Sequence, residues 1–400
     1  MDALMLPLNW QRVRLGDIAE IIGGGTPSTQ VASFWNGSIN WFTPTEIGIT
    51  KYVHKSQRTI TLLGLKKSST KLLPIGTILL TSRASIGDCA ILKVVATTNQ
   101  GFQSLIPLEK INNEFLYYLI LTLKNKLLKL ASGSTFLEVS PNKIKNLLIP
   151  LPPLNEQIAI ANILSDVDNY LHALRALILK KESVKKSLSF ELLSQRKRLK
   201  GFNQAWQRVR LGDIAEIKRG ASPRPIENPK WFCANSNVGW VRISDISKNS
   251  RFLYKTAQKL SKKGIEKSRF IKQNSLIMSM CATIGKPIIT KIDTCIHDGF
   301  VVFENPKIDL NYLYYFLCYI EKEWLESGQQ GSQVNLNVDL IKNKEVFYPK
   351  DLNEQSAIAN ILSGLDNEIT SLKNKKRQFE NIKKALNHDL MSAKIRVLNK

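Results

Sequence analysis

The sequence predicts an α+β protein in which two α/β domains follow one another along the chain and two long helices form an antiparallel coiled coil. Three observations support this fold class. The second half of the chain repeats the first, each repeat ends in a long stretch with helical periodicity, and the part before that stretch mixes strand-like and helix-like runs. A chain of 400 residues has room for this arrangement, which we expect to form a pseudo-twofold internal repeat.

The repeat is visible in two pairs of near-identical segments. Residues 10–21 read WQRVRLGDIAEI, and residues 206–217 carry the same twelve letters. Residues 154–169 recur at 352–367 with three differences in sixteen positions. The offsets of 196 and 198 residues show that the second half copies the first with little slippage, so the chain arose by internal duplication.

The duplication divides the chain into four predicted segments. These are an α/β domain over 1–150, a helical spacer over 151–202, a second α/β domain over 203–348 and a helical spacer over 349–400. Between the near-identical blocks, glycines and apolar positions of the two copies match, whereas the polar residues around them differ. We interpret this pattern as one scaffold that presents two different surfaces.

Each α/β domain combines buried strands with shorter helices. Residues 77–81 and 275–279 are continuous runs rich in apolar and β-branched side chains, which is typical of buried strands. Residues 115–130 and 312–325 have the spacing of helices. At about 150 residues, each domain is large enough to bury a core of its own.

Each spacer predicts one long helix with a single apolar face. Apolar side chains recur at alternating spacings of three and four residues, which places them on one stripe. A helix of about 35–40 residues is about 55–60 Å long, too long for one small domain to cover, so we expect the two stripes to pack together. Two separate surface helices, each packed on its own domain, are the alternative. The stripe residues are Leu164, Val167, Leu171, Leu174, Leu362, Leu365, Ile369 and Leu372.

The charge of the chain favours a polyanionic partner. Lys and Arg number 57 against 33 Asp and Glu, which gives a formal net charge of +24. Nucleic acid is the leading partner for such a charge, and a merely basic protein is the alternative. Residues 1–153 and 203–351 each carry a net +8, so both halves should meet the polyanion.

The composition also indicates in which cellular compartment we expect the protein. No run of 18 apolar residues occurs, which argues against a membrane-spanning helix, and the first residues lack the pattern of a secretion signal. Five scattered cysteines without a CxxC pair argue against a disulfide framework or a structural zinc site. We therefore expect a cytoplasmic protein without a membrane partner.

The sequence lacks the common catalytic motifs. It has no P-loop, no HExxH motif and no Asn-Pro-Pro-aromatic loop of the kind with which amino-methyltransferases hold their target base. Asp213 with Glu216 and Lys218 could hold a metal in a nuclease, but their spacing is too tight for adjacent strands and the first copy lacks the lysine. Residues 295–298 include Cys, His and Asp, which can bind a metal ion. Their counterparts 97–100 include none of these three residue types. We therefore expect neither a catalytic nor a metal site.

A series of short motifs occurs in a fixed order. Trp-x5-Gly-Asp-Ile begins at Trp10, Gly-Thr-Pro-Ser at Gly25, Ser-Arg-Ala-Ser-Ile-Gly at Ser82, Asn-Gln-Gly-Phe at Asn99, and Pro-Leu-Pro-Pro-Leu-Asn-Glu-Gln at Pro150. A long helix follows, and the series occurs again in diverged form in the second half. In this order and over the whole chain, the sequence resembles the specificity (S) subunit of type I restriction–modification enzymes.

The resemblance implies a non-catalytic reader of double-stranded DNA. Each α/β domain would be a target recognition domain for one half of a split, asymmetric site, and the stripe-bearing helices would dock two methyltransferase (modification) subunits. Restriction/translocase subunits would join the complex, and S-adenosylmethionine, ATP and Mg would be held by the partner subunits rather than by this chain. A basic coiled-coil scaffold without sequence-specific DNA reading is the alternative, although a scaffold has no need of two differentiated surfaces.

On this interpretation, Lys and Arg would bind phosphates, and polar loop side chains would read base edges. For Trp41 and its counterpart Trp240, a place in the core is the alternative to a wedge against DNA, and for any single arginine the alternative is a solvated surface charge. The expected DNA-binding residues are Thr26, Ser28, Trp41, Arg83, Asn99, Gln100, Arg219, Arg224, Arg242, Ser244, His297 and Asp298.

Overall fold

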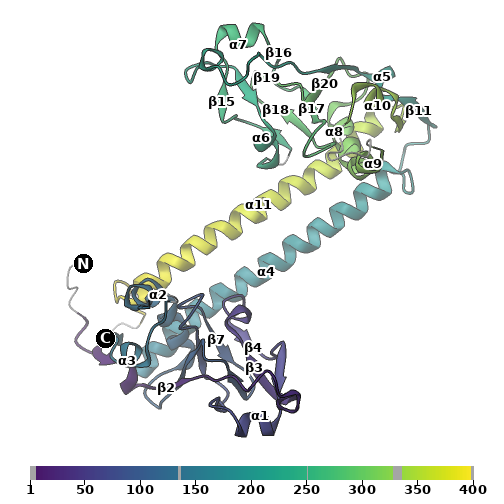
Figure 1. Cartoon of the computed structure of the whole chain (residues 1–400). Helices are drawn as coiled ribbons and strands as arrows, with labels where there is room; N and C mark the ends of the chain where they lie inside the picture. Colours follow the sequence, from purple (N-terminus) through teal and green to yellow (C-terminus); the bar gives the residue numbers. More distant parts are fainter. Residues whose placement is uncertain (1–5, 134–136, 250, 328–335, 398–400) are drawn as a thin grey trace. The chain divides into compact units, whose positions relative to one another are not determined.

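The structure is a computed structural model of the chain and describes residues 6–133, 137–249, 251–327 and 336–397 (Figure 1). The chain forms two compact units. Unit 1 comprises residues 1–175 and 374–400, and unit 2 comprises residues 176–373. Each unit thus joins one α/β segment to one end of each long helix. The segment boundaries expected at 150, 202 and 348 stay predictions.

The described residues of unit 1 form three sheets. A two-stranded sheet pairs β1 with β10 in antiparallel fashion, a five-stranded sheet has the order β2–β9–β6–β7–β4, and a three-stranded sheet has the order β5–β3–β8. The strands are β1 (Gln11–Arg14), β2 (Ala19–Gly23), β3 (Trp35–Phe42), β4 (Tyr52–Val53), β5 (Arg58–Ile60), β6 (Ile78–Leu80), β7 (Cys89–Leu92), β8 (Ala96–Thr98), β9 (Gln103–Pro107) and β10 (Leu148–Leu151). The short helices are η1 (Leu15–Asp17), η2 (Ala32–Phe34), η3 (Pro44–Glu46), α1 (Leu62–Lys66), α2 (Asn113–Leu130) and α3 (Pro141–Lys145).

Unit 2 repeats this topology. Its five-stranded sheet has the order β12–β20–β17–β18–β14, its second sheet the order β15–β13–β19–β16, and β11 pairs with β21. The strands are β11 (Trp206–Arg210), β12 (Glu216–Arg219), β13 (Gly239–Val241), β14 (Phe252–Leu253), β15 (Gln258–Lys259), β16 (Arg269–Ile271), β17 (Leu276–Ser279), β18 (Pro287–Thr290), β19 (Thr294–Ile296), β20 (Phe300–Glu304) and β21 (Glu345–Pro349). The helices are α5 (Leu211–Ile214), η4 (Pro229–Trp231), α6 (Ile243–Ser247), α7 (Lys262–Glu266), α8 (Leu310–Tyr319), α9 (Glu321–Ser327) and α10 (Val338–Asn343). The predicted internal repeat is confirmed.

Two local features differ from the prediction or between the copies. The single helix expected over 312–325 is divided into α8 and α9, because the chain turns at Ile320 and brings Trp324 into the core against Gly285. Strand β16 corresponds in unit 1 to a single bridge between Leu73 and Ala96. The two units therefore share the order of their strands but differ in some of the hydrogen bonds between strands.

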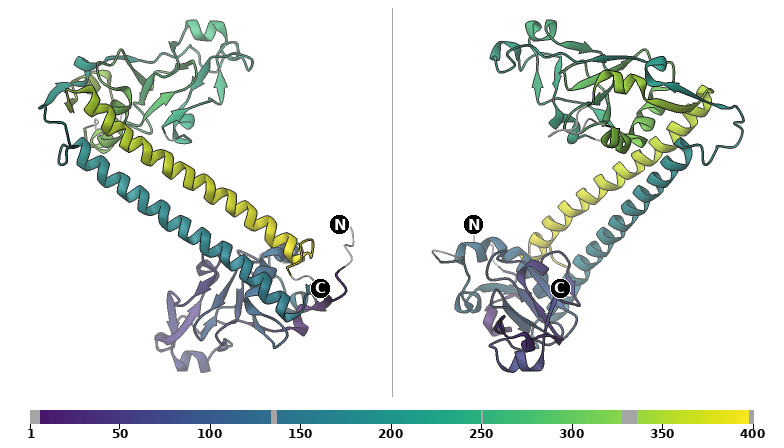
Figure 2. Two further views of the ribbon diagram at one scale, coloured as in Figure 1. Left: turned by 180° about the vertical axis from the view of Figure 1, so that it is seen from behind. Right: turned by 45° about the vertical axis from the view of Figure 1, so that its right-hand side comes forward.

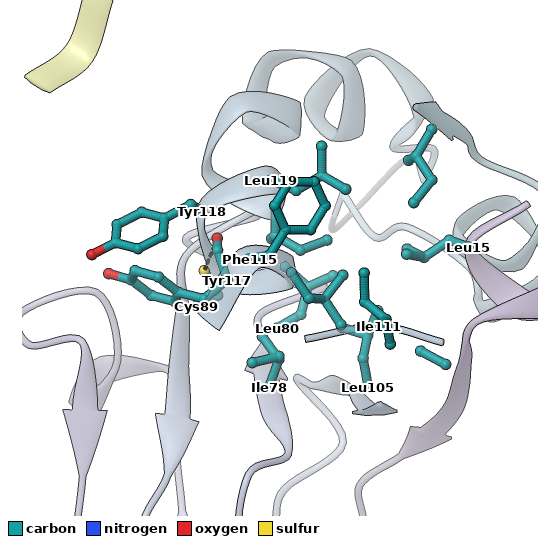
Figure 3. Close-up of a cluster of buried hydrophobic side chains, with 14 of the residues drawn as sticks. Leu15, Ile78, Leu80, Cys89, Leu105, Ile111, Phe115, Tyr117, Tyr118 and Leu119 are labelled. Atoms are coloured by element: carbon teal, nitrogen blue, oxygen red, sulfur yellow. Dashed lines mark hydrogen bonds between the residues drawn. The ribbon is translucent and has the colours of Figure 1, made fainter. Parts of the chain in front are cut away.

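The main core of each unit lies between a helix and the five-stranded sheet. In unit 1, Phe115 and Leu119 of α2 cover Ile78 and Leu80 of β6 (Figure 3). The intervening Leu79 faces a second cluster on the other side of the sheet. Because both faces of β6 are covered, its sequence is a continuous apolar run, as predicted for a buried strand.

The long helices α4 (Leu154–Leu193) and α11 (Leu352–Met391) are antiparallel neighbours within each unit (Figure 2). In unit 1, Asp168 of α4 pairs with Lys383 of α11 at 2.5 Å, and later in α4 Arg175 pairs with the earlier Glu380 at 3.1 Å. In unit 2, the same antiparallel direction joins 181–185 of α4 to 366–368 of α11. The predicted antiparallel pair is confirmed, and the alternative of two separate surface helices is wrong.

The predicted stripe lies on the packed faces of these helices. Five of its residues are buried, and the other three are partly covered. The buried ones are Leu164, Leu171, Leu174, Leu362 and Ile369, and the partly covered ones are Val167, Leu365 and Leu372. Leu164 and Leu362 also belong to the cores of unit 1 and unit 2. The roles of these eight residues in helix packing and in binding partner subunits stay predictions. Within the part of the chain that the structure describes, no helix has the length and apolar composition needed to cross a membrane.

Candidate nucleic-acid interface

In unit 1, two loops carry most of the residues predicted to bind DNA. The loop after β2 lies against the loop between β8 and β9, because the Gly25 amide donates to the Thr98 carbonyl at 2.9 Å. The Thr26 hydroxyl donates to the side-chain oxygen of Gln100 across the same contact. Gly24 permits this approach, since a Cβ there would lie 1.9 Å from the Asn99 carbonyl oxygen. The fold therefore brings Thr26, Asn99 and Gln100 to one surface.

Two tryptophans support this surface from beneath. Trp41 is only 3% exposed, and its indole N–H donates to the Gly25 carbonyl at 2.9 Å. Trp35 packs edge-on against Trp41 and donates its indole N–H to the Ser28 carbonyl at 3.0 Å. This burial agrees with the core interpretation of Trp41, and a contact between its ring and DNA stays a prediction.

Sequence reasoning missed one cation at this surface. The guanidinium of the exposed Arg58 lies 3.7 Å from the centre of the Trp35 ring. Such stacking fixes the direction of an otherwise mobile side chain. No motif marks Arg58, because its neighbour Trp35 lies 23 residues away on another strand.

Arg83 lies on a third loop beside these two. The Ser82 amide donates to the Gly101 carbonyl at 2.8 Å, which holds the loop in place. Arg83 forms an ion pair of 2.8 Å with Glu138, and both side chains are partly exposed. A DNA phosphate would therefore compete with Glu138 for this guanidinium.

In unit 2, the matching loops gather a more strongly charged set. Asp298 accepts a hydrogen bond from the Ser222 hydroxyl at 2.7 Å and from the Arg224 guanidinium at 2.9 Å. The Arg219 guanidinium donates to the Asp298 backbone carbonyl at 2.7 Å. His297 lies beside them, with its Nδ1 3.7 Å from the Asp298 carboxylate. Four of the residues predicted in this half are thus in contact.

Ser222, Arg224, His297 and Asp298 line a hollow of about 180 Å³. Arg242 joins Arg224, His297 and Asp298 in its wall, and the buried Trp240 lies beneath. Ser244 is exposed on α6 and does not line this hollow. The structure therefore brings together every residue predicted in this half except Ser244.

The two interfaces share a frame but differ in charge. The hydrogen bond from Thr26 to Gln100 has its counterpart in the one from Ser222 to Asp298, at the same place between matching strands. Around this bond, unit 2 has an arginine at three positions where unit 1 has an uncharged residue. These positions are Arg219, Arg224 and Arg242 in unit 2 and Gly23, Ser28 and Thr43 in unit 1.

Burial and neighbours set the protonation of the pair at the hollow. Burial lowers the pKa of His297, which favours the neutral imidazole. Burial acts to raise the pKa of Asp298, but the hydrogen bond from Ser222 and the charge of Arg224 outweigh it and hold that pKa below its usual value. At neutral pH a neutral imidazole therefore lies beside a charged carboxylate.

In the part of the chain that the structure describes, the residues of the two clusters considered for catalysis or metal binding take part in other contacts. Asp213 accepts from the Arg210 amide at 3.1 Å, and Lys218 is held between Glu304 at 2.5 Å and Glu216 at 3.0 Å. Cys295 is buried in a small core cluster. Over the described ranges, no three His, Cys, Asp or Glu side chains are grouped so that they could hold a metal ion.

Known proteins resemble the chain along most of its length. Residues 7–182 and 203–381 match the type I restriction modification DNA specificity domain. The MjaIX specificity subunit of Methanocaldococcus jannaschii is 29% identical over 378 residues, which cover 87% of this chain and 85% of that protein. The EcoR124I/EcoR124II specificity subunit of Escherichia coli is 36% identical over 167 residues, which cover 40% and 41% of the two chains.

Solved structures show the same fold. The S subunit of a type-I restriction-modification system from M. genitalium matches with a TM-score of 0.60 at 18% identity, covering 96% of this chain and 98% of that one. The HsdS subunit from Thermoanaerobacter tengcongensis matches with a TM-score of 0.57 at 18% identity, covering 98% and 99%. Two α/β domains with long helices are thus an architecture already seen in other proteins.

Proposed function

Because the chain belongs to the family of type I restriction–modification DNA specificity subunits, we propose that it reads a split, asymmetric DNA site, one half with each α/β domain. One observation carries this proposal. The same inter-loop hydrogen bond recurs in both units, from Thr26 to Gln100 and from Ser222 to Asp298, while the polar side chains around it differ. A common loop framework that carries two different sets of polar side chains suits the recognition of two different half-sites.

The charge distribution supports binding to the DNA backbone as well. The net charge of +24 is spread along the chain, and the α/β segments 1–153 and 203–351 each carry a net charge of +8. Contacts to phosphates release counterions, so we expect affinity to fall steeply with salt for both halves. Phosphate contacts would set the orientation of the chain on the duplex, and the loop side chains would select the sequence.

The long helices are the proposed docking surface for two methyltransferase subunits. On this proposal, the partner subunits would cover several apolar side chains of α4 and α11 that are more than one third exposed. These are Leu177, Leu179, Val184 and Phe190 on α4, and Ile361 and Ile382 on α11.

The chain itself would be non-catalytic within this complex. Restriction/translocase subunits would join it, and S-adenosylmethionine, ATP and Mg would be bound by the partner subunits. The complex would act on DNA in the cytoplasm. A basic coiled-coil scaffold without sequence reading is the competing function, and the differentiated loop surfaces favour the DNA reader.

The test is to map methylated adenines in DNA treated with the chain and the methyltransferase subunit of its host. We expect methylation at one bipartite sequence, and none from the isolated chain with S-adenosylmethionine. Replacing residues 25–145 with the matching segment of a relative should change one half of that sequence and leave the other intact. Methyl transfer by the isolated chain, or a change in both halves together, would contradict the proposal.

A further inference from the structure

The loops of unit 2 hold one arginine in a fixed direction at an exposed edge. The Arg224 side chain is 71% exposed, yet its guanidinium is tied to the Asp298 carboxylate at 2.9 Å. The other oxygen of that carboxylate accepts from the Ser222 hydroxyl at 2.7 Å. Arg219 in turn donates to the backbone carbonyl of Asp298 at 2.7 Å. Ser222 and Arg219 therefore hold Asp298 in place, and Asp298 in turn orients Arg224.

This arrangement reduces the entropy that Arg224 would lose on binding. A free arginine on a surface samples many rotamers, and ordering it costs conformational entropy. Arg224 is already ordered by Asp298, and a guanidinium carries five N–H donors, of which this contact uses only part. The remaining donors are available to a planar ligand group with two acceptors.

The neighbouring carboxylate favours a base over a phosphate as that group. Asp298 already pairs with Arg224 and would repel a phosphate placed there, which offsets part of the attraction from Arg219, Arg224 and Arg242. A base edge carries no net charge, and guanine presents two acceptors, O6 and N7, that match the guanidinium fork. The pair formed by Arg224 and Asp298 is thus better suited to guanine than to the DNA backbone.

The matched position in unit 1 lacks this device. Ser28 stands where unit 2 has Arg224, and Gln100 stands where it has Asp298. The amide of Gln100 accepts from Thr26 in the contact that corresponds to the one between Ser222 and Asp298. No arginine takes part in this contact, and a glutamine amide suits adenine rather than guanine.

We propose that Arg224 reads a guanine in the half-site bound by unit 2, with Asp298 as the positioning residue that sets the direction of its guanidinium. The inference rests on the proposed function and adds the base and the residues that recognise it. It also implies that no arginine of the matching loop in unit 1 selects a guanine in the half-site that unit 1 binds.

The experiment selects bound duplexes from a randomised DNA library, using the chain in complex with the methyltransferase subunit of its host. Four variants are compared with the unchanged chain: Arg224→Ala, Arg224→Lys, Asp298→Asn and, as a matched control, Arg208→Ala. Arg208 is also 71% exposed and also pairs with a carboxylate, Glu345 at 3.4 Å, but it lies on β11 outside the loops. Thermal unfolding of each variant checks that unit 2 remains folded.

We expect Arg224→Ala to reduce the preference for guanine at one position of one half-site by roughly 5- to 150-fold. Arg224→Lys should do nearly the same, because lysine keeps the charge but not the planar fork. Asp298→Asn should reduce the same preference less, and Arg208→Ala should leave every position unchanged. The other half-site should be unaffected in all four.

Different results would separate this inference from the proposed function. If the unchanged chain enriches no sequence, the proposed function itself fails. If it enriches a bipartite sequence but Arg224→Ala weakens all duplexes equally and keeps the preference for guanine, then Arg224 contacts a phosphate and the guanine assignment is overturned. Full selectivity in Arg224→Lys would overturn the role of the planar guanidinium that Asp298 orients.

Discussion

The guanidinium of Arg396 donates to the buried carboxylate of Glu156 at 2.9 Å, although the two residues are 240 positions apart in the chain. The same carboxylate accepts from the indole N–H of Trp10 at 3.1 Å. Residues from near both chain ends thus meet at the first turn of α4. Unit 2 contains the same arrangement of Arg198, Glu354 and Trp206, with the carboxylate again buried.

Removing the arginine from this cluster should destabilise unit 1. In an Arg396→Ala variant the carboxylate of Glu156 keeps the indole donor but loses its counter-charge while remaining buried, a loss of about 3 kcal/mol. Urea unfolding measures this loss as a change in the free energy of unfolding. The control is Arg175→Ala, which breaks an exposed pair with Glu380 and should cost at most about 1 kcal/mol. Equal losses in the two variants would contradict this role of Arg396.

Two glycines should respond to alanine in opposite directions. Gly364 lies inside α11, and a Cβ there would meet nothing within 4 Å, so Gly364→Ala should stabilise the chain by about 0.5–1 kcal/mol. Gly285 has a φ of +75°, and its Cβ would lie 2.3 Å from a ring atom of Trp324. Gly285→Ala should therefore destabilise unit 2 by about 2 kcal/mol or more. Thermal unfolding of both variants tests the pair, and a stabilising Gly285→Ala would show that this packing is wrong.

The two matched tryptophans should differ in their sensitivity to phenylalanine. The Trp41 indole N–H donates to the Gly25 carbonyl, whereas the buried N–H of Trp240 has no hydrogen-bond partner among the described residues. In unit 2 the carbonyl that corresponds to Gly25 is that of Ala221, and it accepts from Ser268 instead, at 2.7 Å. Trp41→Phe should therefore cost about 1 kcal/mol more than Trp240→Phe in urea unfolding. A larger cost for Trp240→Phe would refute the assignment.

The stability of unit 2 should fall as the pH drops from about 7 to 5. Burial lowers the pKa of His297, so below the ordinary value of about 6.5 the unfolded chain takes up a proton that the folded imidazole resists. Asp298 and Arg242 face this imidazole, and Asp298 has a lowered pKa, so its own stabilising effect is lost only at more acidic pH. His297→Asn introduces the residue of unit 1, Asn99, and should flatten the dependence between pH 5 and 7. Urea unfolding at four pH values decides this, and parallel curves for the two proteins would argue against it.

Local patterns made the framework predictable. The stripe from Leu164 to Leu174 and the apolar run around Leu79 depend on spacings of a few residues, and the structure has the expected helix and strand there. The duplication then predicted the topology of unit 2 from that of unit 1, because matched glycines and apolar positions specify the same sheet orders.

Contacts between distant residues were not predictable in the same way. The sequence indicated both Arg224 and Asp298, but not that one orients the other across 74 positions, because that depends on how two loops approach each other. The stacking of Arg58 on Trp35 had no signal at all in the sequence. The division of the helix expected over 312–325 required knowledge of the space that Trp324 fills beside Gly285.

The positions of the core residues along the chain have a consequence for the order in which the two units can complete their cores during synthesis. Leu390 and Met391 belong to the core of unit 1, whose other buried members lie between Trp10 and Leu164. The buried members of the unit 2 core, among the described residues, lie between Leu192 and Leu362. Domains usually fold in the order of their synthesis. Here Leu390 and Met391 are translated after every buried member of the unit 2 core, so the core of unit 1 is completed later than that of unit 2.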